Sequence, residues 1–133
     1  MSFSIRQRMA AFLSEEMGEW GCDYGGVFFT IALSRGASSR IHIDVNDYEK
    51  GYAFLIPLGT YEGGGLTLPT CHATISLVPG QFLAFSSSLL PHFIENAIRT
   101  RYVITGFTDR FVAARSHRVL MTLGYGVSDL NFI

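Results

Sequence analysis

The stretch IHIDVND, residues 41–47, carries two side chains that can bind a metal, His42 and Asp44. Alternate side chains of an extended strand point the same way, so these two would share one face. A third candidate, His92, opens a later apolar segment. Two imidazoles and one carboxylate on one side of a metal leave other coordination positions open, which suits non-haem Fe(II) that reacts with O₂. Because H-x-D with a distant H is common by chance, the spacing alone does not separate a metal site from ordinary polar residues.

Arg101 begins the last strand-like segment of the chain, nine residues after His92. A buried arginine can bind a carboxylate through two parallel charge-assisted hydrogen bonds. Oxygenases that use 2-oxoglutarate need such a cation, because the keto acid chelates the metal at one end and its far carboxylate lies deeper in the protein. Arg99 has the same strand parity, but we place it in the preceding turn, facing solvent. Tyr52 is a further candidate for this pocket, although no local pattern requires it.

The segments that must position these residues are mostly strands. Between about residues 26 and 108, short apolar segments alternate with turn sequences such as SRGASS, YEGGG and VPGQ. Within YEGGG, the run 63–65 predicts a tight hairpin turn with positive φ. About eight short strands without intervening helices favour a β-sandwich or barrel of jelly-roll type. We take these strands to be GVFFTIALS, RIHID, YAFLIPL, LTLP, ATISLV, QFLAFS, HFIEN and RYVITGFT.

Two helices are expected to flank this β core. Apolar residues at helical spacing predict an amphipathic helix over residues 3–20, and residues 109–123 also have a helical pattern. The expected fold class is therefore mainly β with an N-terminal and a C-terminal helix, in one domain. Of the other histidines, we expect His72 to be structural or exposed and His117 to lie on a solvated helix face.

Composition limits the partners that the chain can have. It is 48% hydrophobic and 16% charged, against roughly 25% charged for a typical soluble domain. An apolar surface of this kind suggests a homo-oligomer, a covered cavity or a missing partner chain. The net charge of −1 does not favour binding to nucleic acid or anionic membrane, although a local basic groove stays compatible with it.

The cellular location follows from the termini and the cysteines. Cys22 and Cys71 have no metal-binding spacing, and the N-terminal MSFSIRQRMA lacks the apolar core of a signal peptide. No segment approaches the roughly 20 apolar residues of a membrane span. We therefore expect an intracellular protein, in the cytoplasm or nucleus, that does not enter membranes.

Five stretches follow one another in a characteristic order: FFTIALSRG, HIDVND, FLIPLGTYEGGGLTLP, LVPGQFLAFSSSLLPHFIEN and RYVITGFTDR. In this order, over about residues 26–110, the chain resembles Fe(II)- and 2-oxoglutarate-dependent dioxygenases, most closely the TET/JBP-like oxygenase domains abundant in fungi. The resemblance implies a double-stranded β-helix. It implies His42, Asp44 and His92 as iron ligands and Arg101 as the 2-oxoglutarate anchor. It also implies that decarboxylation of 2-oxoglutarate is coupled, with O₂, to substrate hydroxylation, for which a 5-methylpyrimidine base is the family-based candidate.

The chain departs from that family in two ways. Many relatives carry a serine two residues after the arginine, where this chain has Val103. Thr105 follows on the same face and could take over that role. Relatives also carry a substantial N-terminal segment that shapes the substrate cleft, whereas one predicted helix precedes the first strand here. Residues 1–133 are therefore expected to be a minimal dioxygenase domain whose substrate contacts come from another subunit or are lacking.

Two other functions stay open from the sequence. A zinc-type hydrolase could use the same two histidines and carboxylate, but Arg101 would then have no role and no glutamate base stands near the ligands. A non-catalytic, cupin-like barrel could bind a ligand or a partner. Only the dioxygenase predicts that 2-oxoglutarate binding depends on Arg101.

Overall fold

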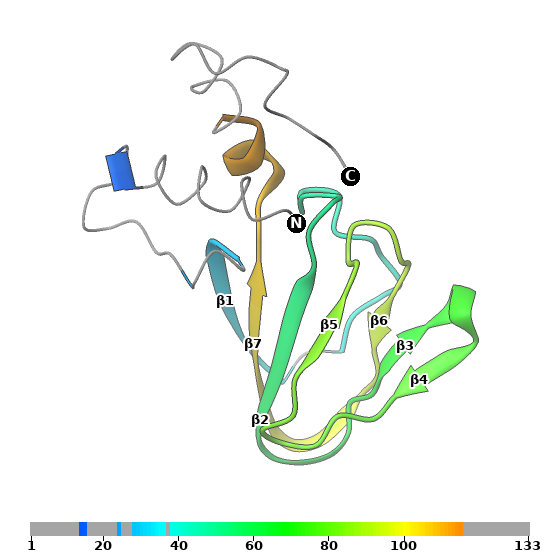
Figure 1. The fold of residues 1–133 in the computed structure, drawn as a ribbon. Coiled ribbons are helices and arrows are strands. Elements are labelled where there is room, and N and C mark those ends of the chain that lie inside the picture. The colour runs from blue at the N-terminus through cyan, green and yellow to red at the C-terminus, as the bar shows by residue number, and fades with distance from the viewer. Residues whose placement is uncertain (1–13, 16–23, 25–27, 37, 116–133) are drawn as a thin grey trace.

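The computed structural model describes residues 14–15, 24, 28–36 and 38–115. Within these residues the protein is mainly β, with strands in two antiparallel sheets (Figure 1). The larger sheet has the order β1–β7–β2–β5 and the smaller one β4–β3–β6. The strands are β1 Thr30–Arg35, β2 Ala53–Gly63, β3 Leu66–Leu68, β4 Ala73–Ile75, β5 Leu83–Phe85, β6 Phe93–Ile94 and β7 Ala97–Phe107, with a 3₁₀ turn at Pro69–Cys71.

The alternating pattern of β2 explains how the larger sheet makes a core. Ala53, Leu55 and Pro57 are buried, whereas the residues between them are half-buried, as expected for a strand with one covered face. Ala53 and Leu55, together with side chains from β3, β5 and β7, form one apolar cluster. Since β3 belongs to the smaller sheet, the core lies between the two sheets. The members of this cluster are Ala53, Leu55, Leu66, Leu68, Phe85 and Val103.

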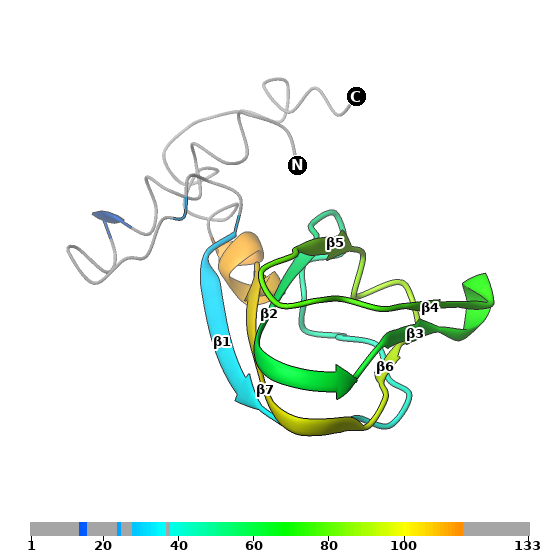
Figure 2. The same cartoon turned by 90° about the horizontal axis from the view of Figure 1, so that it is seen from below.

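The long strands bend from the larger sheet towards the smaller one, as Figure 2 shows for β2 and β7. Gly63 and Gly64 stand at the end of β2, and their φ angles are 76° and 66°. Gly63 pairs with Ala97, and the Gly64 N–H donates to the carbonyl of Asn96 at 3.0 Å. The predicted positive φ is therefore confirmed at these two glycines. The predicted hairpin is wrong, because β2 and β3 enter different sheets, and Tyr61 belongs to β2 and not to a turn.

The predicted strand RIHID is also wrong. In this segment only His42 forms a bridge, to His92. Ser39 on one side bonds to Ile94 and Asp44 on the other bonds to Ser87. Because successive residues have different partners, no continuous ladder of hydrogen bonds forms.

The extent of both predicted helices stays a prediction. Residues 14–15 are helical and the rest of 3–20 lies outside the described residues. Residues 110–115 are helical, and 116–123 lie outside the described residues. No helix in the described part of the chain is long and apolar enough to cross a membrane.

Several large side chains on the described surface are apolar and more than half exposed, including Leu33, Phe82 and Ile98. A subunit or partner that covers this surface stays a prediction.

Candidate metal centre

The segment 39–48 carries two of the predicted ligands and connects the smaller sheet to the end of β7. Near its start, the backbone of His42 exchanges two hydrogen bonds with His92, at 3.0 and 2.9 Å. In the middle, the Asp44 N–H donates to the carbonyl of Ser87 at 3.0 Å. At its end, the Tyr48 N–H donates to the carbonyl of Thr108 at 2.7 Å. Backbone hydrogen bonds, and not a regular strand, therefore fix the places of His42 and Asp44.

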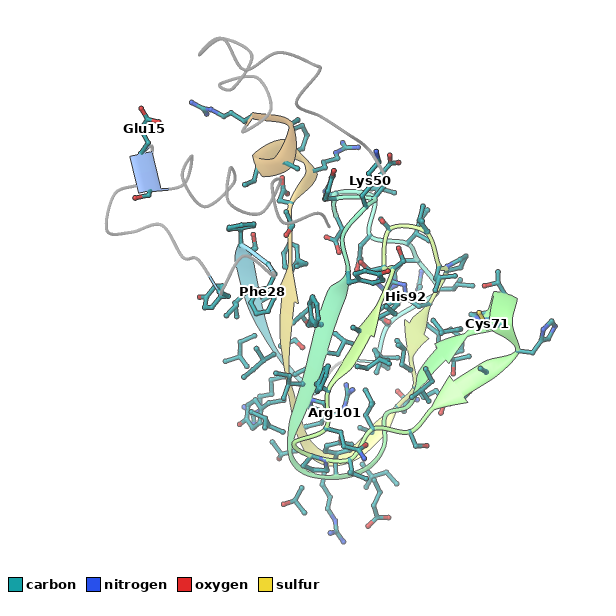
Figure 3. The ribbon with its side chains drawn as sticks, in the orientation of Figure 1. Glu15, Phe28, Lys50, Cys71, His92 and Arg101 are labelled. Carbon is teal, nitrogen blue, oxygen red and sulfur yellow. The ribbon has the colours of Figure 1, made fainter. Side chains whose placement is uncertain are left out.

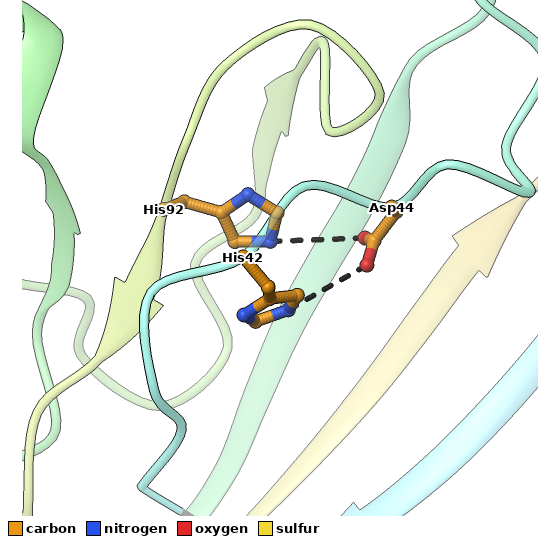
Figure 4. Close-up of side chains that lie close together, drawn as sticks. All are labelled: His42, Asp44 and His92. Atoms are coloured by element: carbon orange, nitrogen blue, oxygen red, sulfur yellow. Dashed lines mark ion pairs between the residues drawn. The ribbon is translucent and has the colours of Figure 1, made fainter.

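The three predicted ligands come together in one group, as Figure 4 shows. One ligand atom from each of His42, Asp44 and His92 lies within 4.8 Å of the others. The Nε2 atom of His42 is 3.5 Å from one carboxylate oxygen of Asp44. The Nε2 atom of His92 is 3.7 Å from the other. This group could hold a metal ion, and its exposure decreases from His42 to Asp44 to His92.

The hydrogen bonds of the two imidazoles suit metal binding. Nδ1 of His42 lies 2.7 Å from the carbonyl oxygen of Arg40, and Nδ1 of His92 lies 2.9 Å from that of Leu90. A carbonyl oxygen only accepts, so each Nδ1 carries a hydrogen. The Nε2 lone pair of each neutral ring is then free to bind a metal next to Asp44. The same partners fix the plane of each ring.

A side-chain hydrogen bond to Ser87 holds Asp47, which lies near the end of the segment 39–48. Ser87 is 2% exposed, and its hydroxyl donates to Oδ2 of Asp47 at 2.5 Å. Burial raises the pKa of the Asp47 carboxyl above its ordinary value, and the charges of Asp44 and Asp109 act in the same direction. The hydrogen bond from Ser87 lowers this pKa and so partly offsets the burial.

His42, Asp44 and His92 line a cavity of about 200 Å³. This is smaller than the roughly 300–1,000 Å³ of pockets for drug-sized ligands, so it suits a small molecule. Asp44 is the only carboxylate among the described residues that line it. Its lining consists of Ser34, Ser39, His42, Asp44, Ala53, Leu55, Leu66, Phe85, His92, Ile94, Arg101, Val103 and Thr105.

Arg101 lines the same cavity and is 2% exposed. In Figure 3 it lies lower than His92, towards the bend of β2 and β7. Its Nε and Nη2 atoms are buried and have no hydrogen-bond partner among the described residues. A guanidinium is always charged in proteins, and burying an unpaired charge costs several kcal/mol. The cavity therefore has a cationic end where Nε and Nη2 of Arg101 have no hydrogen-bond partner among the described residues.

The other predicted residues fall into three groups. Thr105 and Val103 line the cavity with Arg101, as their shared parity predicts. Arg99 is exposed and lies 3.5 Å from Glu62, so its predicted exposure is confirmed, although it belongs to β7 and not to a turn. His72 is exposed, as predicted, and Tyr52 is also exposed, at 55%, and does not line the cavity. His117 lies outside the described residues.

Neither family models nor curated protein sequences match this chain. The resemblance to TET/JBP-like domains therefore stays a prediction.

Two residues near the site, Tyr61 and Ser87, are not predicted from the sequence. The pattern YEGGG predicts a turn at Tyr61, yet this residue lies on β2 with its ring centroid 5.4 Å from Cζ of Arg101. The polar residues Thr60 and Glu62 on either side of Tyr61, soon after the apolar run AFLIPL, were the signal that could have placed it in a strand. Ser87 stands in the run SSS, which gives no indication that one hydroxyl is buried.

Proposed function

We propose that this protein is an Fe(II)- and 2-oxoglutarate-dependent dioxygenase of the TET/JBP-like type, with a double-stranded β-helix fold. The observation that carries the proposal is the pair of functional ends in one small cavity. One end is the group His42, Asp44 and His92, and the other is Arg101 with two unpaired nitrogens. A five-carbon 2-oxo diacid has a chelating group at one end and a carboxylate at the other, and so matches both.

The residues have separate tasks in this proposal. Both histidines keep Nδ1–H on backbone carbonyls and offer Nε2 to the metal, while Asp44 offers a carboxylate oxygen. Arg101 binds the far carboxylate through two parallel hydrogen bonds. The Thr105 hydroxyl could add a third. Fe(II) bound there would supply the chemistry of O₂ activation.

The apolar lining has a task as well. Ala53, Leu55 and Leu66 keep most of the cavity wall free of polar groups. In such an environment the attraction between Arg101 and a carboxylate is stronger than in water, and bulk water is kept away from the reacting groups.

The donor set argues against the zinc-type hydrolase. Such an enzyme needs a general base near the metal-bound water. Among the described residues that line the cavity, the only carboxylate is Asp44, which the metal itself would use. The unpaired Arg101 would also have no task in that reaction. A non-catalytic barrel that binds an anion stays the second candidate, since it would also use Arg101.

The substrate class is proposed from the resemblance alone. A 5-methylpyrimidine base is the candidate, and a base in duplex DNA would have to leave the stack to reach the metal. The chain has a net charge of −1, so we expect a free nucleoside or a single strand to be a better first substrate to test than a long duplex.

The deciding experiment is an anaerobic titration of the Fe(II)-loaded protein with 2-oxoglutarate. We expect the visible metal-to-ligand charge-transfer band that a chelated 2-oxo acid produces. Arg101→Ala should lose the band at matched 2-oxoglutarate concentration. The control Arg99→Ala, at an exposed position on the same strand, should keep it.

Two outcomes would reject the proposal. One is no band in a folded protein that has bound iron, which would favour the non-catalytic barrel. The other is an equally strong band in Arg101→Ala, which would remove Arg101 from the co-substrate site. Circular dichroism of each variant shows whether it is folded.

A further inference from the structure

In the ligand-free protein, another residue must hold the buried guanidinium of Arg101 in the position where it would bind an anion. On the facing strand β2, Gly59 pairs directly with Arg101 and contributes no side chain. Tyr61, two residues further along β2, occupies the diagonal position, which lies within reach of an aromatic ring. The Tyr61 ring centroid is 5.4 Å from Cζ of Arg101, within the range of a cation–π interaction.

The Tyr61 ring is itself fixed at its far end. Its hydroxyl donates a hydrogen bond to the carbonyl oxygen of Leu77, sixteen residues away in sequence. Leu77 is 7% exposed, so this acceptor belongs to the buried part of the protein. The ring is half-buried, and its position is therefore set both by β2 and by the connection between β4 and β5.

Gly64 limits the arginine from another direction. A Cβ atom at Gly64 would come 3.0 Å from Cδ and 3.2 Å from Nε of Arg101. The backbone of Gly64 therefore lies directly against the arginine side chain. Together, Tyr61 and Gly64 restrict the side chain of Arg101 while using none of the hydrogen bonds of its Nε and Nη2.

We propose that Tyr61 is the positioning residue for Arg101, and that its ring makes the cavity selective for 2-oxo acids with a second carboxylate. The proposal rests on the function proposed above. A π face attracts the guanidinium but accepts none of its in-plane hydrogen bonds. The cation is thereby held in place while its N–H groups stay available for a planar carboxylate. A carboxylate partner at position 61 would instead neutralise the arginine and compete with the ligand.

The test compares 2-oxoglutarate with 2-oxobutyrate, which offers the same chelating end without the far carboxylate. Dissociation constants come from the anaerobic charge-transfer band of the Fe(II)-loaded wild type, Tyr61→Leu and Tyr61→Phe. We expect Tyr61→Leu to weaken 2-oxoglutarate about tenfold and to change 2-oxobutyrate less than about twofold. Tyr61→Phe keeps the ring and loses only the hydrogen bond to Leu77. Its loss of 2-oxoglutarate affinity should therefore be clearly smaller than that of Tyr61→Leu.

Two results of this titration would overturn the inference. An equal loss for both acids would mean that Tyr61 merely supports the fold of the cavity. Unchanged 2-oxoglutarate affinity in Tyr61→Leu would mean that Arg101 is held without the ring.

A second measurement needs no 2-oxo acid and separates this inference from the proposed function. Urea unfolding of the ligand-free wild type, Tyr61→Leu, Arg101→Met and the double variant gives a double-mutant cycle. We expect Tyr61 and Arg101 to be coupled by at least about threefold in the unfolding equilibrium constant. If Tyr61 and Arg101 are coupled but the protein shows no charge-transfer band, the contact between them is supported and the proposed dioxygenase function is rejected. Absence of coupling would reject the positioning role, whatever the band shows.

Discussion

The two ends of the cavity are built on different principles. At the proposed metal end, the side chains of His42 and Asp44 are 42% and 37% exposed and lie on a segment with little regular structure, whereas His92 is 5% exposed. At the other end, Arg101 is 2% exposed and lies within the eleven-residue strand β7. Water can solvate the exposed side chains of His42 and Asp44, whereas the guanidinium of Arg101 is buried and two of its nitrogens have no hydrogen-bond partner among the described residues. His42 and Asp44 are therefore placed by backbone hydrogen bonds at little cost, whereas burial of Arg101 is expected to lower stability.

This difference predicts opposite effects of mutation at the two ends. Removing an exposed candidate ligand, His42 or Asp44, should weaken metal binding strongly and change the stability of the metal-free protein little. Removing the buried cation should abolish anchoring of the anion and make the ligand-free protein more stable. Each variant below tests one side of this contrast.

The largest effect is expected for His92→Ala. It leaves two ligands of three, and we expect Fe(II) affinity to fall on the order of 100-fold or more. Anaerobic metal titration followed by calorimetry measures this. His72→Ala is the control, because His72 is exposed and does not belong to the group His42, Asp44 and His92. The Fe(II) affinity of this variant should stay within about twofold of the wild type. Equal losses in the two variants would reject the assignment of the ligands.

Next in size is the effect of Arg101→Met on the ligand-free protein. Methionine has a similar length and no charge, so replacing the unpaired guanidinium should raise the free energy of unfolding by about 1–4 kcal/mol. Urea unfolding measures it, with Arg99→Met as the exposed control, which should change by less than about 0.5 kcal/mol. Iron affinity should be unchanged. A less stable Arg101→Met would contradict the idea that the cation lacks a partner.

A smaller, pH-dependent effect is expected for Ser87→Ala. The variant removes the donor to Asp47, so the pKa of that carboxyl, already raised by burial, should rise further in the folded state. A raised folded pKa gives stability below the unfolded pKa that is lost as pH rises through the folded value. Ser87→Ala should therefore lose about 1 kcal/mol near pH 7 and less towards pH 4.

Chemical unfolding at the two pH values checks this effect. Ser88→Ala is the matched control, because the buried hydroxyl of Ser88 has no hydrogen-bond partner among the described residues. It should show no such pH dependence. The Ser87 prediction is wrong if its variant loses more stability at pH 4 than at pH 7.

Local patterns in the sequence were sufficient for the strand parity of the anion end. Arg101, Val103 and Thr105 alternate with outward-facing residues, and a period of two placed all three on one face, as the structure has them. The mainly β class followed from the same kind of pattern, because short apolar segments between turns have few other folds. The predicted strand RIHID failed, since its residues bond to several partners in turn, and periodicity does not report on partners.

What the sequence determined by itself was the set of residue types that can do chemistry and, for Arg101, Val103 and Thr105, the strand face that they share. What only the tertiary structure decided was which of them meet. The approach of His42 to His92 depends on backbone hydrogen bonds across fifty residues, and the contact of Tyr61 with Arg101 depends on the register of β2 against β7. Contacts of this kind are set by long-range pairing and packing, which leave no local periodicity in the chain. The missing hydrogen-bond partners of Arg101 follow for the same reason, since burial and pairing are properties of the folded protein.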